Sequence, residues 1–177
     1  MRRLILLRHA KSSWPDDIWD HERPLAPRGI EAMALVGRYL TEEKLIPDRV
    51  VVSTAKRTRE TFELLSAPFK PPHTQLVSEP RIYEAAVSAL VEVVRETPES
   101  CKTLMMIGHN PGIAELSYFL VRPAVSSKRD LERLTTKFPT ASIAVLEFEA
   151  NDWDVMPRTA HLERFITPKQ IGGVDED

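Results

Sequence analysis

The stretch that decides the fold is MRRLILLRHAKSSW, residues 1–14. Its apolar run from Leu4 to Leu7 is typical of a short buried strand. The run stops abruptly at Arg8 and His9, which places two polar side chains at the carboxyl end of that strand. The same pattern at other strand ends would indicate that these residues belong to a functional site.

The pattern recurs twice along the chain. Val50–Val52 is predicted to be a second buried strand, followed by Ser53-Thr54 as a helix N-cap and by Arg57 in the first turn of that helix. Residues 103–107 are predicted to be a third buried strand, which is followed by His109. Sites in open α/β sheets form beyond the carboxyl ends of the strands. If the three strands are neighbours, two arginines and two histidines converge there.

The remaining segments alternate between strand and helix patterns. This alternation predicts a three-layer α/β/α sandwich with a mostly parallel sheet, and a closing hairpin predicts a mixed edge. Residues 122–140 are charged and irregular, with some helix expected. The expected helices are 28–43, 55–65, 87–94 and 111–120, and the other expected strands are 75–78, 142–148 and 159–166.

Length and composition favour one cytoplasmic domain. The chain has 177 residues, so we expect a single domain over residues 1–170 and a flexible acidic tail over 171–177. A net charge of −2 gives no basic field to attract nucleic acid or a membrane surface. No apolar segment reaches the ~20 residues that a membrane span needs. The single cysteine, Cys101, cannot form an intramolecular disulfide and fits a reducing compartment.

The converging side chains suit a tetrahedral dianion. Arginine presents a planar fork that matches phosphate oxygens. Nearby arginine charges keep a histidine neutral, and neutral imidazole is a nucleophile able to attack phosphorus. The second histidine can donate a hydrogen bond to an oxygen whose charge grows in the transition state. Adjacent arginines repel a cation and no HExxH spacing is present, so we expect neither a metal nor another cofactor.

Three blocks, LLRHAKSS, STAKRTRET and IGHNPG, resemble the motifs of the histidine phosphatase superfamily, which has the phosphoglycerate-mutase-like fold. The resemblance spans roughly residues 3–166. Within the superfamily the chain is similar to SixA-type phosphohistidine phosphatases, which are short and carry a block like HERPLAPRG after the first motif. Ala10 replaces the usual glycine, and Lys11 replaces the acidic residue of mutases, which argues against a mutase.

The resemblance implies a role for each matching residue. His9 would be the phosphorylated nucleophile, and Arg8, Arg57 and His109 would complete the phosphate pocket. Arg23, in HERPLAPRG, stands where short members carry an arginine that can reach the pocket. The remaining members of the implied substrate-binding set are Ser12, which stands where many members have threonine, and Asn110, beside His109.

The leaving group decides the substrate class. An ester expels an alkoxide, comparable to water with its pKa of roughly 15.7, and needs a general acid. Phosphohistidine expels an imidazole, whose side-chain pKa is roughly 6.5, and needs much less help. Glu84, in PRIYEAAVSAL, is the first candidate for the acid and Glu79 a weaker one, but Glu84 can equally be an ordinary residue that precedes a helix.

Three functions therefore follow as predictions. The first is a metal-independent phosphatase that forms a phosphohistidine intermediate and acts on phosphohistidine in proteins. The second is a small-molecule phosphomonoesterase that uses Glu84 as its acid. The third, from another class, is a non-catalytic module that binds phosphate or a phosphoprotein. Trp14 and Trp19 flank the pocket loop, where they either line a substrate rim or cover the core; the oligomeric state does not follow from the sequence.

Overall fold

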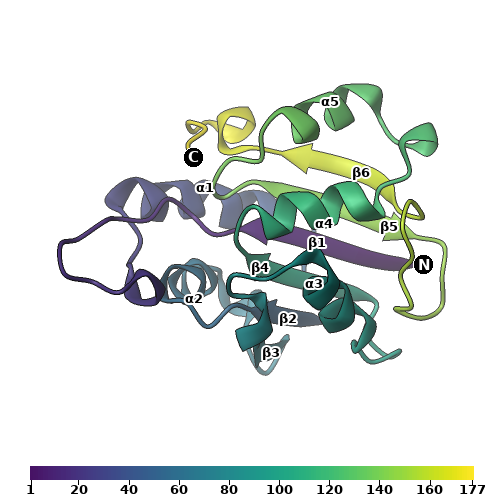
Figure 1. Cartoon of the computed structure of the whole chain (residues 1–177), viewed down its shortest axis with the longest axis horizontal. Coiled ribbons are helices and arrows are strands. Elements are labelled where there is room, and N and C mark those ends of the chain that lie inside the picture. The colour runs from purple at the N-terminus through teal and green to yellow at the C-terminus, as the bar shows by residue number, and fades with distance from the viewer.

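The computed structural model describes all residues, Met1–Asp177, and contains one six-stranded sheet of order β3-β2-β4-β1-β5-β6 (Figure 1). The strands β1, β4, β2 and β3 run parallel to one another, whereas β5 is antiparallel to β1 and to β6. The predicted α/β fold with a mixed edge is therefore confirmed. The strands are β1 (Arg2–Arg8), β2 (Arg49–Val52), β3 (Gln75–Ser78), β4 (Thr103–Gly108), β5 (Ile143–Phe148) and β6 (His161–Ile166).

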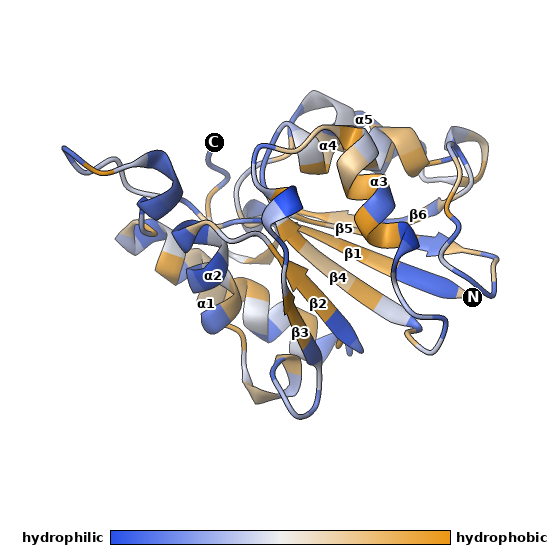
Figure 2. Cartoon of the chain, turned by 60° about the horizontal axis from the view of Figure 1, so that its bottom comes forward, coloured by the Kyte–Doolittle hydropathy of each residue, from blue (hydrophilic) through white to orange (hydrophobic).

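Helices cover both faces of the sheet. The alternation of β1 sends Leu4 and Leu6 into a core under α3, α4 and α5, and Ile5 and Leu7 into a second core under α1 and α2 (Figure 2). No helix combines the length and the apolar character needed to cross a membrane. The helices are α1 (Pro27–Glu42), α2 (Lys56–Glu63), α3 (Val87–Arg95), α4 (Gly112–Leu120) and α5 (Lys128–Thr136).

The three polar strand ends are neighbours, as the sequence pattern requires. In the register of the sheet, Arg8 lies opposite Gly108, and Val52 lies opposite Ile107. The residues that follow β1, β2 and β4 therefore leave the sheet side by side. This edge is the part of the fold that brings the predicted site together.

One local expectation was wrong. The helix after β2 takes Ala55 as its N-cap, without a side-chain cap, so Ser53-Thr54 does not cap it. Ser53 lies two residues before Ala55, and its hydroxyl contacts His109 at the end of β4. The segment between Ala10 and Pro27 is a loop that contains a short 3-10 turn, η1 (Asp20–Glu22), and an isolated bridge between Ser12 and Leu25.

The RPLAPRG segment holds this first loop against α1. The backbone N–H of Ser13 donates to the carbonyl of Pro24 at 2.8 Å, and the N–H of Ala26 donates to the carbonyl of Lys11 at 2.9 Å. A Cβ on Gly29 would lie 2.2 Å from that Lys11 oxygen, so only glycine allows α1 to approach the loop. The glycine thereby fixes the start of the loop that follows the first motif.

The acidic C-terminal residues lie against the domain. The backbone N–H of Thr140 donates to the carbonyl of Glu176 at 2.8 Å, and the Asp177 carboxylate pairs with Lys137 at 2.9 Å. These contacts fold the tail back toward the end of β1. The flexibility expected for 171–177, like the domain boundary at residue 170, stays a prediction.

Candidate active site

His9 follows β1 directly and is almost completely buried, with 7% of its surface exposed. Its Nδ1 lies 2.7 Å from the carbonyl oxygen of Ala10. A carbonyl only accepts, so Nδ1 carries the proton of the neutral ring and donates it to this bond. The lone pair is then on Nε2, which makes no hydrogen bond. This arrangement leaves one ring nitrogen free to act as a nucleophile.

The environment of His9 keeps its ring neutral. Burial lowers the pKa of His9 well below its usual range, and the neighbouring His109, Arg8 and Arg57 lower it further. The hydrogen bond to Ala10 acts in the opposite direction but is outweighed. The reactive, unprotonated form therefore persists below neutral pH.

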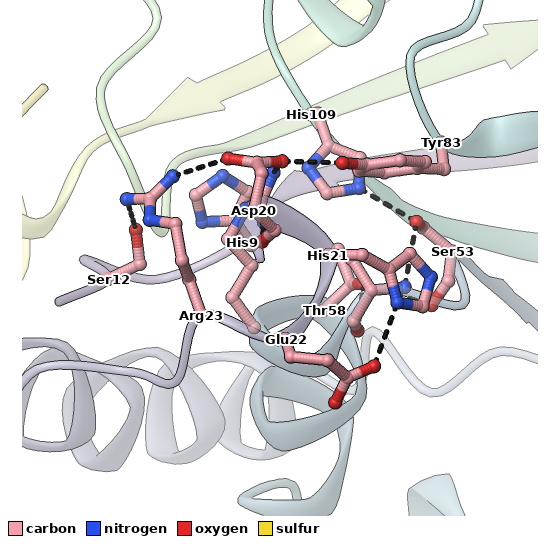
Figure 3. Close-up of polar contacts among 12 residues, drawn as sticks. His9, Ser12, Asp20, His21, Glu22, Arg23, Ser53, Thr58, Tyr83 and His109 are labelled. Carbon is pink, nitrogen blue, oxygen red and sulfur yellow. Dashed lines mark hydrogen bonds and ion pairs between the residues drawn. The ribbon is translucent and has the colours of Figure 1, made fainter. Parts of the chain in front are cut away.

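His109 faces His9 from the end of β4, with the two ring centroids 5.2 Å apart. Its Nε2 lies 2.7 Å from the hydroxyl of Ser53, while Nδ1 is buried without a partner. In Figure 3 the Nδ1 side of the ring faces His9 and Asp20. Burial, followed by the charge of Arg57, lowers the pKa of His109 to about 3, so this ring is neutral too. If Ser53 donates to Nε2, the proton of His109 is on Nδ1 and is available to a bound oxyanion.

Arg8 and Asn110 share one anchor. The Nη1 of Arg8 donates to the carbonyl of Phe138 at 2.8 Å, and the Nδ2 of Asn110 donates to the same oxygen at 2.9 Å. The Nε of Arg8 and the Oδ1 of Asn110 are buried without partners. One backbone oxygen thus orients two of the predicted site residues, and each keeps an unused polar atom.

An acidic residue that the sequence reading did not single out, Asp20, occupies the middle of the site (Figure 3). Its Oδ1 accepts from Arg23 Nη1 at 3.1 Å, and its Oδ2 accepts from Arg57 Nη2 at 3.2 Å. The hydroxyl of Tyr83 donates to the same Oδ2 at 2.5 Å, and the Nη1 of Arg57 donates to the Asp20 carbonyl at 2.8 Å. The carboxylate therefore holds the donors that were expected to bind phosphate.

These donors also set the proton affinities of the cluster. The hydrogen bond from Tyr83, followed by the contacts of Arg23 and Arg57, lowers the pKa of Asp20 to about 2. Burial and the carboxylate raise the pKa of Tyr83 to about 12. At neutral pH Asp20 is an anion and Tyr83 keeps its proton, so Asp20 cannot serve as a proton donor.

Ser12 contacts Arg23. The Nη2 of Arg23 donates to the Ser12 hydroxyl at 2.6 Å, and its Nε donates to the carbonyl of Ser13 at 3.0 Å. Together with the bond to Asp20, these contacts occupy all three nitrogens of the guanidinium. Ser12 thus orients Arg23 in this structure, and the direct phosphate contact expected of Ser12 stays a prediction.

Glu84 lies on the wall of the same cavity. Asp20, Arg57, Tyr83 and His109 also line this space of about 530 Å³. The side chain of Glu84 is exposed and makes no hydrogen bond, and its backbone has a φ of 50°. It is therefore near the site but is not enclosed as a buried general acid would be.

The structure brings every predicted site residue to one end of the sheet. The residues that sequence reasoning missed are Asp20, Ser53 in its contact with His109, and Tyr83. Ser53 directly follows the second predicted strand and Tyr83 directly precedes Glu84, but no periodic pattern marks any of the three. The one sequence signal for Asp20 is its position three residues before Arg23, where an acidic side chain can pair with the arginine. No group of three or more His, Cys, Asp or Glu side chains is arranged to hold a metal ion, and a metal-independent reaction stays a prediction.

The fold and this edge of the sheet define an α/β enzyme that handles phosphate. The chain belongs to the histidine phosphatase superfamily (branch 1), because the model of that family matches residues 4–106, more than half of its length. It is thus a phosphatase by family, and the family resemblance drawn from its motifs is confirmed.

Similar proteins extend over almost the whole chain. An uncharacterized protein of Mycobacterium tuberculosis is 36% identical over 163 residues, which cover 92% of this chain and 100% of that protein. The SixA structure of Nakamurella multipartitia is 29% identical with a TM-score of 0.79, covering 94% of this chain and 96% of its own. The SixA structure of Agrobacterium tumefaciens is 25% identical with a TM-score of 0.76, covering 94% and 98%. The chain is therefore similar to SixA proteins in fold and length.

Proposed function

We propose that the protein removes phosphate from phosphohistidine in proteins, by way of a phosphohistidine intermediate on His9 and without a metal ion. The observation that carries this proposal is the state of His9: a buried, neutral ring whose Nε2 has no partner and lies among arginines. The SixA proteins of Nakamurella multipartitia and Agrobacterium tumefaciens, which have a provisional assignment as phosphohistidine phosphatases, support the substrate class.

The proposed reaction has two transfers. The Nε2 of His9 attacks phosphorus in line as the bond from phosphorus to the substrate nitrogen breaks. The substrate ring, protonated on its other nitrogen, takes the electron pair of that bond and leaves as neutral imidazole. Arg8, Arg57 and the Nδ1–H of His109 hold the phosphoryl oxygens, with Arg23 as a further donor. Water then attacks the phosphorylated His9, which releases orthophosphate and restores the neutral ring.

The acid–base character of the site favours phosphohistidine over an ester. Asp20 is ionised at neutral pH, and Tyr83 commits its proton to Asp20. Glu84 is exposed rather than enclosed. A leaving imidazole, with a side-chain pKa of roughly 6.5, needs no strong proton donor, whereas an alkoxide does. Glu84 on the cavity wall is the observation that keeps a phosphomonoesterase as the second candidate.

The test compares two substrates without added metal: a phosphohistidine protein and an alkyl phosphomonoester such as glycerol 2-phosphate, whose leaving alkoxide needs a proton donor. Wild type, His9→Ala and Glu84→Gln are assayed with each. We expect cleavage of phosphohistidine that His9→Ala abolishes and Glu84→Gln preserves. Acid quenching during turnover would destroy a phosphoramidate, so the intermediate on His9 is trapped at alkaline pH and located by mass spectrometry.

Other outcomes assign other functions. Efficient ester cleavage that collapses in Glu84→Gln would make the protein a phosphomonoesterase with Glu84 as its acid. Phosphate binding with no turnover of either substrate and no phosphorylated His9 would contradict the enzyme proposal and favour a phosphate-binding module.

A further inference from the structure

The loop between β1 and η1 presents an unusual surface beside the site. Residues 14–19, WPDDIW, are all exposed, and we call them the 14–19 loop. Trp14 is 75% exposed, Trp19 is 70% and Ile18 is 43%. The loop projects away from the body of the molecule (Figures 1 and 2). Both tryptophans are therefore on the surface and do not cover the core.

Contacts connect this loop to the pocket at both of its ends. The guanidinium carbon of Arg23 lies 3.2 Å from the centre of a Trp14 ring, a cation–π contact. Trp19 stacks on His21 with centroids 5.1 Å apart, and His21 meets the edge of Tyr83 at 4.9 Å. The exposed aromatic surface is thus continuous with side chains of the phosphate site.

The charges of the loop are negative. Asp16 and Asp17 lie between the two tryptophans, and the side chain of neither forms a hydrogen bond or an ion pair. The pocket itself carries arginines that attract a phosphoryl group. A substrate that fits both regions has a phosphoryl group for the pocket and cationic and apolar side chains for the loop.

A small phosphoester does not account for this surface. Sites for small ligands are concave and surround most of the ligand, whereas the 14–19 loop extends outward from the pocket mouth. Tryptophan is among the residues that contribute most to protein–protein binding, and exposed apolar surface beside a site marks contact with a macromolecule. A phosphorylated side chain of a protein must bring the surrounding protein surface over such a loop.

The geometry points to the 14–19 loop as a docking surface for the protein substrate, whose surface beside the phosphohistidine carries apolar and basic side chains. This inference rests on the proposed function, because the occupant is the phosphohistidine protein itself. Ile18 and Trp19 contact the apolar part of that surface, and Asp16 and Asp17 pair with its cations.

The experiment uses three phosphohistidine substrates of graded context. These are free phosphohistidine and two short phosphohistidine peptides, one with leucine and lysine around the phosphorylated residue and one with serine and glutamate. For wild type we expect kcat/KM to be at least about 10-fold higher for the first peptide than for the second. In the Ile18→Ser/Trp19→Ser variant we expect this preference to disappear through a rise in KM.

Two controls separate docking from folding and from charge. Met156→Ala removes a side chain that is 51% exposed and outside the site, and it should keep the preference of wild type. In wild type, kcat/KM for the leucine–lysine peptide should fall when salt is raised from about 0.05 M to about 0.5 M, because salt screens the charges of Asp16 and Asp17. Asp16→Asn/Asp17→Asn should keep the apolar contact but show a smaller fall.

Each outcome decides the inference. Docking is supported if the Ile18→Ser/Trp19→Ser variant loses kcat/KM only with the leucine–lysine peptide and turns over free phosphohistidine at the wild-type rate. If the Ile18→Ser/Trp19→Ser variant loses kcat/KM equally with all three substrates, the loop acts on the pocket itself. If its kcat/KM is unchanged with all three, the loop makes no contact with the substrate. Either result overturns the inference. Failure of wild type to cleave any of the three would instead overturn the proposed function.

Discussion

The carboxylate of Asp20 is predicted to compete with phosphate for the same arginines. In the free protein its two oxygens accept from Arg23 and Arg57. A phosphoryl group held by these guanidiniums must displace the carboxylate or share its donors. Asp20→Asn keeps the shape of the side chain and one acceptor oxygen but removes the charge. We therefore expect this substitution to tighten the binding of an inorganic phosphate dianion.

The expected magnitude follows from the contacts. Ion pairs that remain accessible to water contribute roughly 0.2–1 kcal/mol each, and the side chain of Asp20 is 39% exposed. In Asp20→Asn, phosphate no longer has to break two arginine pairs and no longer meets the repulsion of a carboxylate. Its binding free energy should therefore improve by about 1–2 kcal/mol. At about 1.4 kcal/mol for each factor of ten, the Kd should fall by about 5- to 30-fold.

The assay is calorimetric titration of wild type and Asp20→Asn with orthophosphate at pH 8, where orthophosphate is a dianion. Asp16→Asn is the matched control, because it removes the same charge from a nearby exposed residue that has no contact in the site. Weaker phosphate binding in Asp20→Asn would refute the reasoning and show that the carboxylate positions the arginines for their ligand. A Kd unchanged within about two-fold would refute it as well.

Three further predictions test other contacts of the site. Gly29→Ala should lower the free energy of unfolding by about 1–3 kcal/mol in urea titrations. Gly37→Ala, whose Cβ would make an ordinary van der Waals contact with Leu65 at 3.9 Å, should raise it or leave it unchanged. Ser53→Ala should reduce the single-turnover rate constant on phosphohistidine by about 10-fold, because the ring of His109 loses the hydroxyl that orients it; an unchanged rate constant would contradict this role. The pKa of His9 and that of His109 are lowered in the folded state, so the unfolded chain binds more protons below about pH 6.5. The free energy of unfolding should therefore fall as the pH drops below that value, by about 1.4 kcal/mol per pH unit for each histidine. His9→Asn should make this fall less steep, which urea titrations at about pH 6.5 and about pH 5 would show.

The strand ends could be predicted from the sequence because their signal is local. Each buried strand is a continuous apolar run, and the polar residues at its tip stand out against that run, as Arg8 and His9 do after β1. The parallel register then brings the three tips together without further information. Fold class and the main site residues follow from this combination of apolar runs and strand-end chemistry.

The contacts made across loops could not be predicted in the same way. Asp20 is one acidic residue in a polar loop, and its role arises only when η1 folds over the pocket and meets Tyr83, 63 residues away in sequence. Ser53 was assigned to the helix that follows it, yet its hydroxyl binds His109, 56 residues away. Propensity describes a residue and its chain neighbours, so partners of this kind are outside its reach.

The charges of the site account for the position of Asp20 among the arginines. The pocket gathers the guanidiniums of Arg8, Arg23 and Arg57 around two neutral histidine rings, so without a counter-ion it would hold uncompensated cations. The Asp20 carboxylate compensates two of these arginines and holds them at the mouth of the pocket. Under the proposed function, an arriving phosphoryl group brings its own negative charge and takes the place of the carboxylate. Under the same proposal, exchange of one anion for the other keeps the arginines oriented between turnovers, and the ring of His9 is neutral when the phosphoryl group arrives.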